Sequence, residues 1–187
     1  MKKGIVYRST GSWYTVQSEG VFYECRIKGK LRLKGIKSTN PVAVGDWVYF
    51  EVDSHANANE GNITKIEERQ NYIVRKSVNL SKQTHIIASN IDQVFLIVTL
   101  NNPPTFPAFI DRFLVTAEAY QIPAIILFNK IDTYSKLELE EITLLQKTYE
   151  NIGYSTYLIS AIQDEGIEKV KELMQDKVSM FSGHSGV

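Results

Sequence analysis

Four residues that follow an apolar run have the types and spacing of a guanine-recognition motif. Asn129, Lys130, Ile131 and Asp132 come after residues 124–128 as an Asn-Lys-x-Asp tetrad. The Asp132 carboxylate could accept hydrogen bonds from the N1–H and N2–H₂ groups of guanine, whereas adenine offers neither donor. We expect Asn129 to tie neighbouring loops together and the Lys130 stem to lie along the purine. The alternative is a helix-start turn, in which Asn and Asp are also common.

Two later segments could complete a nucleotide site. Ser160 and Ala161 follow the next apolar stretch, where backbone N–H groups could meet the guanine O6 atom. A glycine segment at 183–187 matches the first part of the phosphate-binding pattern G-x-x-x-x-G-K-[ST], without the closing Gly-Lys-Ser/Thr. Its residues are Gly183, His184, Ser185, Gly186 and Val187. We expect its backbone amides to form a nest for phosphate, and His184 to contribute its backbone rather than its imidazole.

These motifs fall where an α/β fold places its ligand-binding loops. The predicted strands cover residues 94–98, 123–128, 154–159 and 177–181, and the predicted helices cover 106–120, 136–150 and 166–176. This alternation predicts a mostly parallel sheet in a three-layer domain. Such sheets bind ligands at the carboxyl ends of their strands, so the motifs should meet at one edge.

The first part of the chain has the pattern of a small barrel. Five short stretches rich in β-branched and aromatic residues cover 4–8, 13–17, 21–27, 44–52 and 62–66. Five strands with no helical period predict a closed all-β barrel of the OB-fold type, with an SH3-type barrel as the alternative. The polar residues 69–90 are interpreted as a connector. We therefore predict an OB-fold over 1–72 and the α/β domain over 73–187.

Charge divides unevenly along the chain. Residues 1–85 contain 14 Lys and Arg against 8 Asp and Glu, a net of +6, whereas residues 86–187 contain 7 against 13, a net of −6. Six basic residues occur with no acidic residue among them: Arg26, Lys28, Lys30, Arg32, Lys34 and Lys37. Such a basic cluster is typical of RNA-binding surfaces, and the alternative is a solvated hairpin face. Five aromatic residues could stack on bases or fill the barrel core: Trp13, Tyr14, Tyr23, Trp47 and Tyr49.

Composition narrows the class of protein. The chain has 187 residues, 43% of them apolar, which suffices for ordinary cores. No stretch reaches the roughly 18 to 20 apolar residues of a membrane span, and the start turns polar too early for a signal peptide. Cys25 is the only cysteine, which excludes an internal disulfide and a multi-cysteine zinc site. We expect a cytoplasmic monomer with no membrane partner.

The order of the motifs resembles that of a known family. The barrel, residues 110–115 (Ile-Asp-Arg-Phe-Leu-Val), the tetrad, the Ser160-Ala161 pair and the glycine segment occur as in the ribosome small subunit-dependent GTPase A family. The resemblance implies a circularly permuted GTPase of late small-subunit maturation, whose GTP hydrolysis the small subunit stimulates. It also implies an OB-fold that binds ribosomal RNA, a permuted domain that binds GTP or GDP with Mg²⁺, and Zn²⁺ in a C-terminal extension.

The same resemblance assigns roles to the motifs. Asn129, Lys130 and Asp132 would recognise guanine, Ser160 and Ala161 would form the second base loop, and the glycine segment would begin phosphate binding. The 187 residues contain no P-loop Lys with its Ser/Thr and no Cys/His zinc cluster. We expect these 187 residues to contain no catalytic residue and no metal site, to fail to hydrolyse GTP, and to bind it weakly.

Three other interpretations compete with this one. A non-catalytic RNA-binding or docking module with a degenerate nucleotide site would share the fold and lack nucleotide selectivity. Another permuted GTPase of ribosome assembly would share the motif order, although the N-terminal barrel disfavours it. An ATP-binding α/β protein is disfavoured by Asn129 and Asp132.

Charge reversal at Lys30, Arg32 and Lys34 together should weaken binding to small-subunit RNA and flatten its salt dependence. Each phosphate contact that is lost lowers the slope of log affinity against log salt by about 0.7 to 0.9. Filter binding across a salt series measures both quantities. If affinity and slope are unchanged, the alternative interpretation, a solvated hairpin face, would be favoured.

Overall fold

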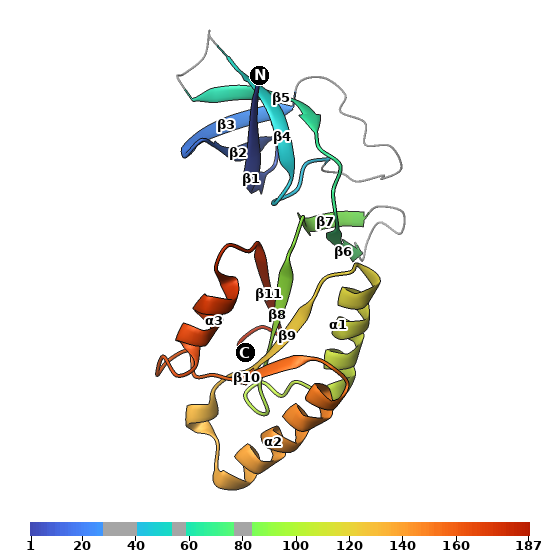
Figure 1. Ribbon diagram of the computed structural model, residues 1–187, viewed down its shortest axis with the longest axis vertical. Coiled ribbons are helices and arrows are strands. Elements are labelled where there is room, and N and C mark those ends of the chain that lie inside the picture. Colours follow the sequence, from blue (N-terminus) through green and yellow to red (C-terminus); the bar gives the residue numbers. More distant parts are fainter. Residues whose placement is uncertain (28–40, 54–58, 77–83) are drawn as a thin grey trace. The chain divides into compact units, whose positions relative to one another are not determined.

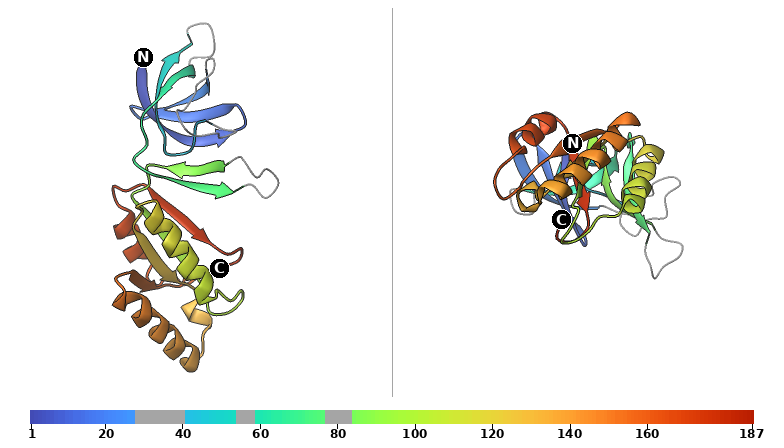
Figure 2. Two further views of the ribbon diagram at one scale, coloured as in Figure 1. Left: turned by 90° about the vertical axis from the view of Figure 1, so that its right-hand side faces the viewer. Right: turned by 90° about the horizontal axis from the view of Figure 1, so that it is seen from below.

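The computed structural model describes residues 1–27, 41–53, 59–76 and 84–187. These residues form two compact units, Met1–Asn90 and Ile91–Val187, which are described one at a time. Figure 1 labels the helices and strands of both units, and Figure 2 gives two further views. In the part of the chain that the structure describes, no helix is long and apolar enough to cross a membrane.

The first unit contains a closed barrel of five strands. They are β1 (Lys2–Thr10), β2 (Trp13–Ser18), β3 (Val21–Ile27), β4 (Trp47–Val52) and β5 (Glu60–Ile66). The order around the barrel is β1-β2-β3-β5-β4, with β1 paired to β4 and β3 running parallel to β5. Alternate side chains such as Val16, Val48 and Phe50 are fully buried inside it. The predicted OB-type barrel is confirmed, and Tyr14 and Tyr23 belong to its core rather than to a stacking surface.

Residues 69–90 contain a β-hairpin. β6 (Tyr72–Lys76) pairs antiparallel with β7 (Thr84–Ser89). The connector interpretation is wrong for these residues, because polar neighbours masked two short β-branched pairs, Ile73-Val74 and Ile86-Ile87. The first compact unit extends through this hairpin to Asn90. The predicted division into an RNA-binding part and a nucleotide-binding part at residue 72 stays a prediction.

A buried ion pair joins the barrel to the chain that enters the hairpin. Arg69 donates from Nε and Nη2 to the two carboxylate oxygens of Asp46, each at 2.6 Å. Their side chains are only 5% and 0% exposed. Ser89, the last residue of β7, donates its hydroxyl to the same carboxylate at 2.6 Å. A Cβ atom at Gly45 would lie 2.0 Å from the Ser89 carbonyl oxygen, so this close approach requires glycine.

The second unit is a parallel sheet covered by helices on both faces. Its strands are β8 (Gln93–Val98), β9 (Ala124–Phe128), β10 (Ser155–Leu158) and β11 (Ser179–Gly183), in the order β10-β9-β8-β11. Helices α1 (Pro107–Ala119) and α2 (Lys136–Asn151) pack on one face, and α3 (Ile167–Met174) packs on the other. A short 3₁₀ helix, η1, spans Ile131–Thr133. The three-layer α/β prediction is confirmed.

Each face of this sheet has its own apolar cluster. Leu96 and Ile126 point toward α1 and α2, where they pack with Ile142. Phe95 and Leu127, one residue along each strand, pack on the α3 face instead. This period of two within buried strands explains why 94–98 and 124–128 read as continuous apolar runs. The two clusters hold the strands and helices together, and so they fix where the loops after the strands begin.

The Asp46→Ala variant should lower the free energy of unfolding of the first unit by about 3 to 5 kcal/mol, because it leaves the buried Arg69 guanidinium unpaired. Denaturant unfolding followed by tryptophan fluorescence measures this, since Trp13 and Trp47 are the only tryptophans. The matched control is Glu67→Ala, which removes the partner of the half-exposed Lys3 and should change little. Equal effects of the two variants would contradict the structural role given to the buried pair.

Candidate nucleotide-binding site

The three predicted segments lie at the carboxyl ends of neighbouring strands. The tetrad follows β9, the Ser160-Ala161 pair follows β10, and the glycine segment begins at the last residue of β11. Strand β8 lies between β9 and β11, so the loop that follows it, residues 99–106, comes between the tetrad and the glycine segment. One edge of the sheet therefore gathers four loops, as open parallel sheets do at their ligand sites.

The tetrad and the Ser160 loop are tied together by two side chains. Asn129 is 7% exposed and accepts a hydrogen bond at its Oδ1 from the Ala161 backbone N–H, at 3.1 Å. Ser160 is fully buried and donates its hydroxyl to Asp132 Oδ1 at 2.5 Å. Asp132 itself is exposed. The buried Ser160 hydroxyl therefore holds Oδ1, while the rest of the carboxylate faces solvent. This arrangement orients an anionic acceptor, which is what recognition of a donor edge requires.

The Lys130 ammonium bridges two loops. Its Nζ atom donates to the Asn102 carbonyl oxygen and to the Gly186 carbonyl oxygen, each at 2.6 Å. Lys130 adopts a left-handed backbone conformation with φ of 67°, which turns the chain from β9 into η1. The head group therefore holds the glycine segment against the loop after β8. The predicted contact of its aliphatic stem with a purine stays a prediction.

A second layer of side chains, which sequence reasoning missed, fixes the loop after β8. The Tyr134 hydroxyl donates to the Asn129 carbonyl oxygen at 3.1 Å and accepts from the Leu100 N–H at 3.0 Å. Burial raises the pKa of the Tyr134 phenol, so the hydroxyl keeps the proton that it donates. Thr99 donates its hydroxyl to the Pro103 carbonyl oxygen at 2.6 Å. The run Asn-Asn-Pro-Pro at 101–104 was the available signal, because such residues mark structured turns.

Glu138 braces the same loop from α2. It accepts hydrogen bonds from the Ser135 backbone, as part of a capping box at the start of the helix, and from Asn101 Nδ2. The hydrogen bonds from Ser135, and then the one from Asn101, lower the pKa of the Glu138 carboxyl. The carboxylate is therefore ionised at neutral pH. Helix α2 and the loop after β8 are thus joined next to the tetrad.

The glycine segment is shaped for close backbone approach. A Cβ atom at Gly183 would lie 2.7 Å from the Ile97 carbonyl oxygen, and Gly186 has a φ of +86°. The Val187 N–H donates back to the His184 carbonyl oxygen at 3.4 Å. The His184 ring packs against Phe109 of α1, with ring centroids 3.9 Å apart. The imidazole is therefore turned toward the helix, and the exposed backbone of this segment is what a phosphate could meet.

The basic cluster is described only at its first residue. The Arg26 guanidinium lies 3.8 Å from the centre of the Trp13 ring. The other members, Lys28, Lys30, Arg32, Lys34 and Lys37, lie outside the described residues. Elsewhere on the barrel, Lys3 lies 4.9 Å from the Trp47 ring centre and Lys65 lies 5.4 Å from that of Tyr49. Within the described ranges no three His, Cys, Asp or Glu residues gather as metal ligands.

Comparison with known proteins agrees with this arrangement. Residues 66–187 match the family model described as RsgA GTPase, and residues 3–63 match the RsgA N-terminal domain. The chain belongs to the RsgA GTPase family. It is 65% identical over 185 residues to the small ribosomal subunit biogenesis GTPase RsgA of Flavobacterium johnsoniae, covering 98% of this chain and 57% of that protein. For the Bacteroides fragilis protein of the same name, the identity is 52%, over 99% of this chain and 59% of the relative.

Solved structures match the RsgA-family fold over both units. The structure of YloQ, described as a circularly permuted GTPase, has a TM-score of 0.71 and 29% identity, covering 100% of this chain and 61% of its own. YjeQ from Thermotoga maritima has a TM-score of 0.78 and 32% identity, covering 99% of this chain and 61% of its own. The chain thus spans about three fifths of the length of these relatives and structures. The predicted family and the predicted circular permutation are confirmed.

The Lys130→Ala variant should release the glycine segment, because it removes both hydrogen bonds that the ammonium makes. We expect the ¹⁵N order parameter of Gly186 to fall from a rigid value of ~0.85 toward ~0.6 or below in the nucleotide-free chain. Lys136→Ala, at an exposed lysine of α2, is the control and should leave Gly186 unchanged. If Gly186 is equally rigid in both variants, the bridge does not hold the segment.

Proposed function

We propose that this RsgA-family chain carries the guanine-reading and RNA-binding parts of a GTPase that acts in late maturation of the small ribosomal subunit. The observation that supports this best is the joining of the tetrad to both neighbouring loops. Asp132 is held by Ser160, and Lys130 is held to the glycine segment through Gly186. These contacts support a site in which base recognition and phosphate binding share one edge of the sheet.

Guanine selectivity comes from the Asp132 carboxylate. Guanine presents two donors, N1–H and N2–H₂, to an anionic acceptor, and adenine would leave that acceptor unpaired. The Ser160 hydroxyl limits the rotation of the carboxylate by binding Oδ1 at 2.5 Å. The Ser160-Ala161 loop borders the base, and Asn129 fixes that loop through the Ala161 N–H. These residues bind and orient the base rather than react with it.

The phosphates would lie along the exposed backbone of the glycine segment. Its amides and the positive φ of Gly186 resemble the nests that bind phosphate oxygens elsewhere. Mg²⁺ in nucleotide sites is held largely by the phosphates themselves, with one or two protein oxygens. Among the described residues, no three His, Cys, Asp or Glu side chains gather as they would at a Zn²⁺ site. That this polypeptide alone fails to hydrolyse GTP stays a prediction, and measured turnover would refute it.

The barrel is the proposed contact for ribosomal RNA. Arg26 over Trp13, Lys3 near Trp47 and Lys65 near Tyr49 pair a cation with a ring, and such surfaces bind phosphates and stack bases together. The relatives are named for biogenesis of the small ribosomal subunit. We assign this chain the same partner, a cytoplasmic location and a monomeric state.

The Asp132→Asn variant should change which purine nucleotide the chain prefers. Asn presents one donor and one acceptor, which match the C2 carbonyl and N1–H of xanthine, whereas Asp matches the two donors of guanine. Titrations at millimolar nucleotide should give wild-type chain a preference for GDP over ADP of about tenfold or more. The variant should lose affinity for GDP and gain affinity for xanthosine diphosphate.

Glu140→Gln on α2 is the matched control, because it also replaces an exposed carboxylate with an amide, at a residue outside the tetrad and both neighbouring loops. It should bind all three nucleotides as wild type does. Equal affinity of the wild-type chain for GDP and ADP would contradict the assignment of guanine selectivity to Asp132. It would favour the RNA-binding or docking module with a degenerate site.

A further inference from the structure

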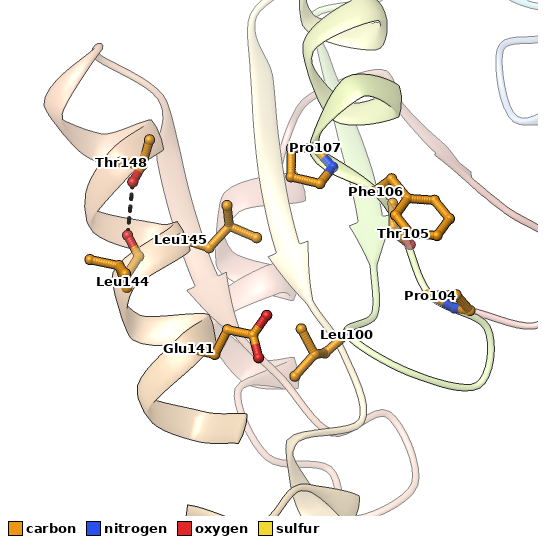
Figure 3. A pocket seen from close by; sticks show the side chains of 9 residues that line it. All are labelled: Leu100, Pro104, Thr105, Phe106, Pro107, Glu141, Leu144, Leu145 and Thr148. Carbon is orange, nitrogen blue, oxygen red and sulfur yellow. Dashed lines mark hydrogen bonds between the residues drawn. The ribbon is translucent and has the colours of Figure 1, made fainter. Parts of the chain in front are cut away.

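An apolar groove lies between the segment that enters α1 and the face of α2 (Figure 3). It has a volume of about 370 Å³. Phe106 and Pro107 stand on one side, Leu145 projects toward them from α2 on the other, and Leu100 lies between them. Leu144 lines the outer edge of the groove on α2. The groove does not include any residue assigned to the nucleotide or to RNA.

The rim of the groove exposes large apolar side chains. Phe106 is 67% exposed and Leu144 is 70% exposed. Leu137 lies two helical turns before Leu144 on the same side of α2 and is 77% exposed, and Ile152, just beyond the helix, is 65% exposed. These residues extend the groove into a stripe along α2. A stripe of apolar residues beside a concave surface marks an interaction site rather than ordinary scattered exposure.

Charge indicates which kind of partner fits. Glu141 is the charged residue among those that line the groove, and in the described part of the chain its carboxylate has no ion pair. It lies in the half of the chain that carries a net charge of −6, from 7 Lys and Arg against 13 Asp and Glu over residues 86–187. A nucleic acid would be repelled by this field, whereas Lys and Arg would be attracted. The Thr148 hydroxyl donates its proton within the helix, to the Leu144 carbonyl oxygen at 2.9 Å.

We propose that this groove binds a segment of a protein partner that carries apolar anchors at helical spacing, flanked by Lys or Arg. The anchors would fill the space between Phe106 and Leu145 and cover Leu144 at the edge, as amphipathic helices do in apolar grooves, and a basic residue would pair with Glu141. Proteins that bind RNA expose such basic segments, because they must neutralise phosphates. Binding of such a segment is a function separate from nucleotide and RNA binding, and it does not depend on either.

The groove also shares a loop with the nucleotide site. Leu100 belongs to the loop after β8, which Tyr134 holds through the Leu100 N–H. Two residues later, the Asn102 carbonyl oxygen accepts from Lys130, whose other bond fixes Gly186. A segment bound in the groove therefore contacts the loop on which the glycine segment depends.

Fluorescence anisotropy tests the proposal on the complete 187-residue chain. The probe is a labelled peptide of about 14 residues, roughly four helical turns, with Leu at helical spacing and Lys elsewhere. The comparison peptide has every Lys replaced by Glu. We expect the Lys peptide to bind, the Glu peptide to bind at least about tenfold more weakly, and Glu141→Gln to weaken the Lys peptide severalfold in low salt.

The decisive variant is Leu144→Asp, with Val115→Asp as its control. Both residues are exposed apolar positions in helices, at 70% and 68%, and both variants add one negative charge, but Val115 does not line the groove. Leu144→Asp should reduce the affinity for the Lys peptide by about tenfold, because it removes apolar surface that the bound segment would cover, and Val115→Asp should not.

Equal affinity of the two Asp variants for the Lys peptide would overturn the proposal, since binding would then depend on net charge alone. Equal binding of the two peptides to wild-type chain would overturn it as well. So would direct binding of a labelled single-stranded RNA that Leu144→Asp weakens and Val115→Asp does not, which would make the groove a nucleic-acid site. GDP selectivity measured on Leu144→Asp should stay as in wild type, so failure here is separable from failure of the guanine assignment.

Discussion

A single ammonium group joins the parts of the proposed site. The Lys130 Nζ atom lies 2.6 Å from the carbonyl oxygens of Asn102 and Gly186, which belong to loops that follow two different strands. An ammonium has three donors and no acceptor, so two carbonyls can be held at once while one donor stays available. Without this group, nothing else among the described contacts ties the glycine segment to the tetrad. The loops proposed to bind the base and the phosphates would then have no direct contact that keeps them at a fixed distance.

The sheet makes this bridge possible. Strand β8 separates β9 from β11, so the tetrad reaches the glycine segment across the loop that follows β8. That loop is fixed independently by Tyr134, by Thr99 and by Glu138 of α2. The Asn102 carbonyl oxygen that Lys130 binds is therefore presented by a braced loop rather than by a free one. The same bracing places Leu100 at the apolar groove, where a partner could act on the site without touching the nucleotide.

The sequence predicted the elements better than it predicted the contacts between them. The apolar runs at 94–98 and 124–128 revealed buried parallel strands, because both faces of those strands are covered by helices. The short strands of the hairpin were missed, because Ile73-Val74 and Ile86-Ile87 are too brief to outweigh their polar neighbours. The buried pair of Asp46 and Arg69 was missed for another reason, since charged residues 23 positions apart give no local signal of contact.

At the candidate site, too, the sequence predicted the segments better than the contacts between them. The placement of the tetrad, the Ser160-Ala161 pair and the glycine segment after strands was predictable, because each follows an apolar run at a fixed spacing, and their roles in nucleotide binding stay predictions. The bond between Ser160 and Asp132, the brace from Tyr134 and the packing of His184 on Phe109 were not predictable. They depend on which strands are neighbours, and strand order is a property of the fold rather than of any local pattern.

The most direct measurement of the central claim is an amide chemical-shift titration of the chain with GDP and with ADP. If the loops form one guanine site, Asp132, Ala161 and Gly186 should shift together with GDP and give a single dissociation constant, and ADP should shift them far less at the same concentration. Independent constants for the three residues, or equal shifts with ADP, would contradict the account.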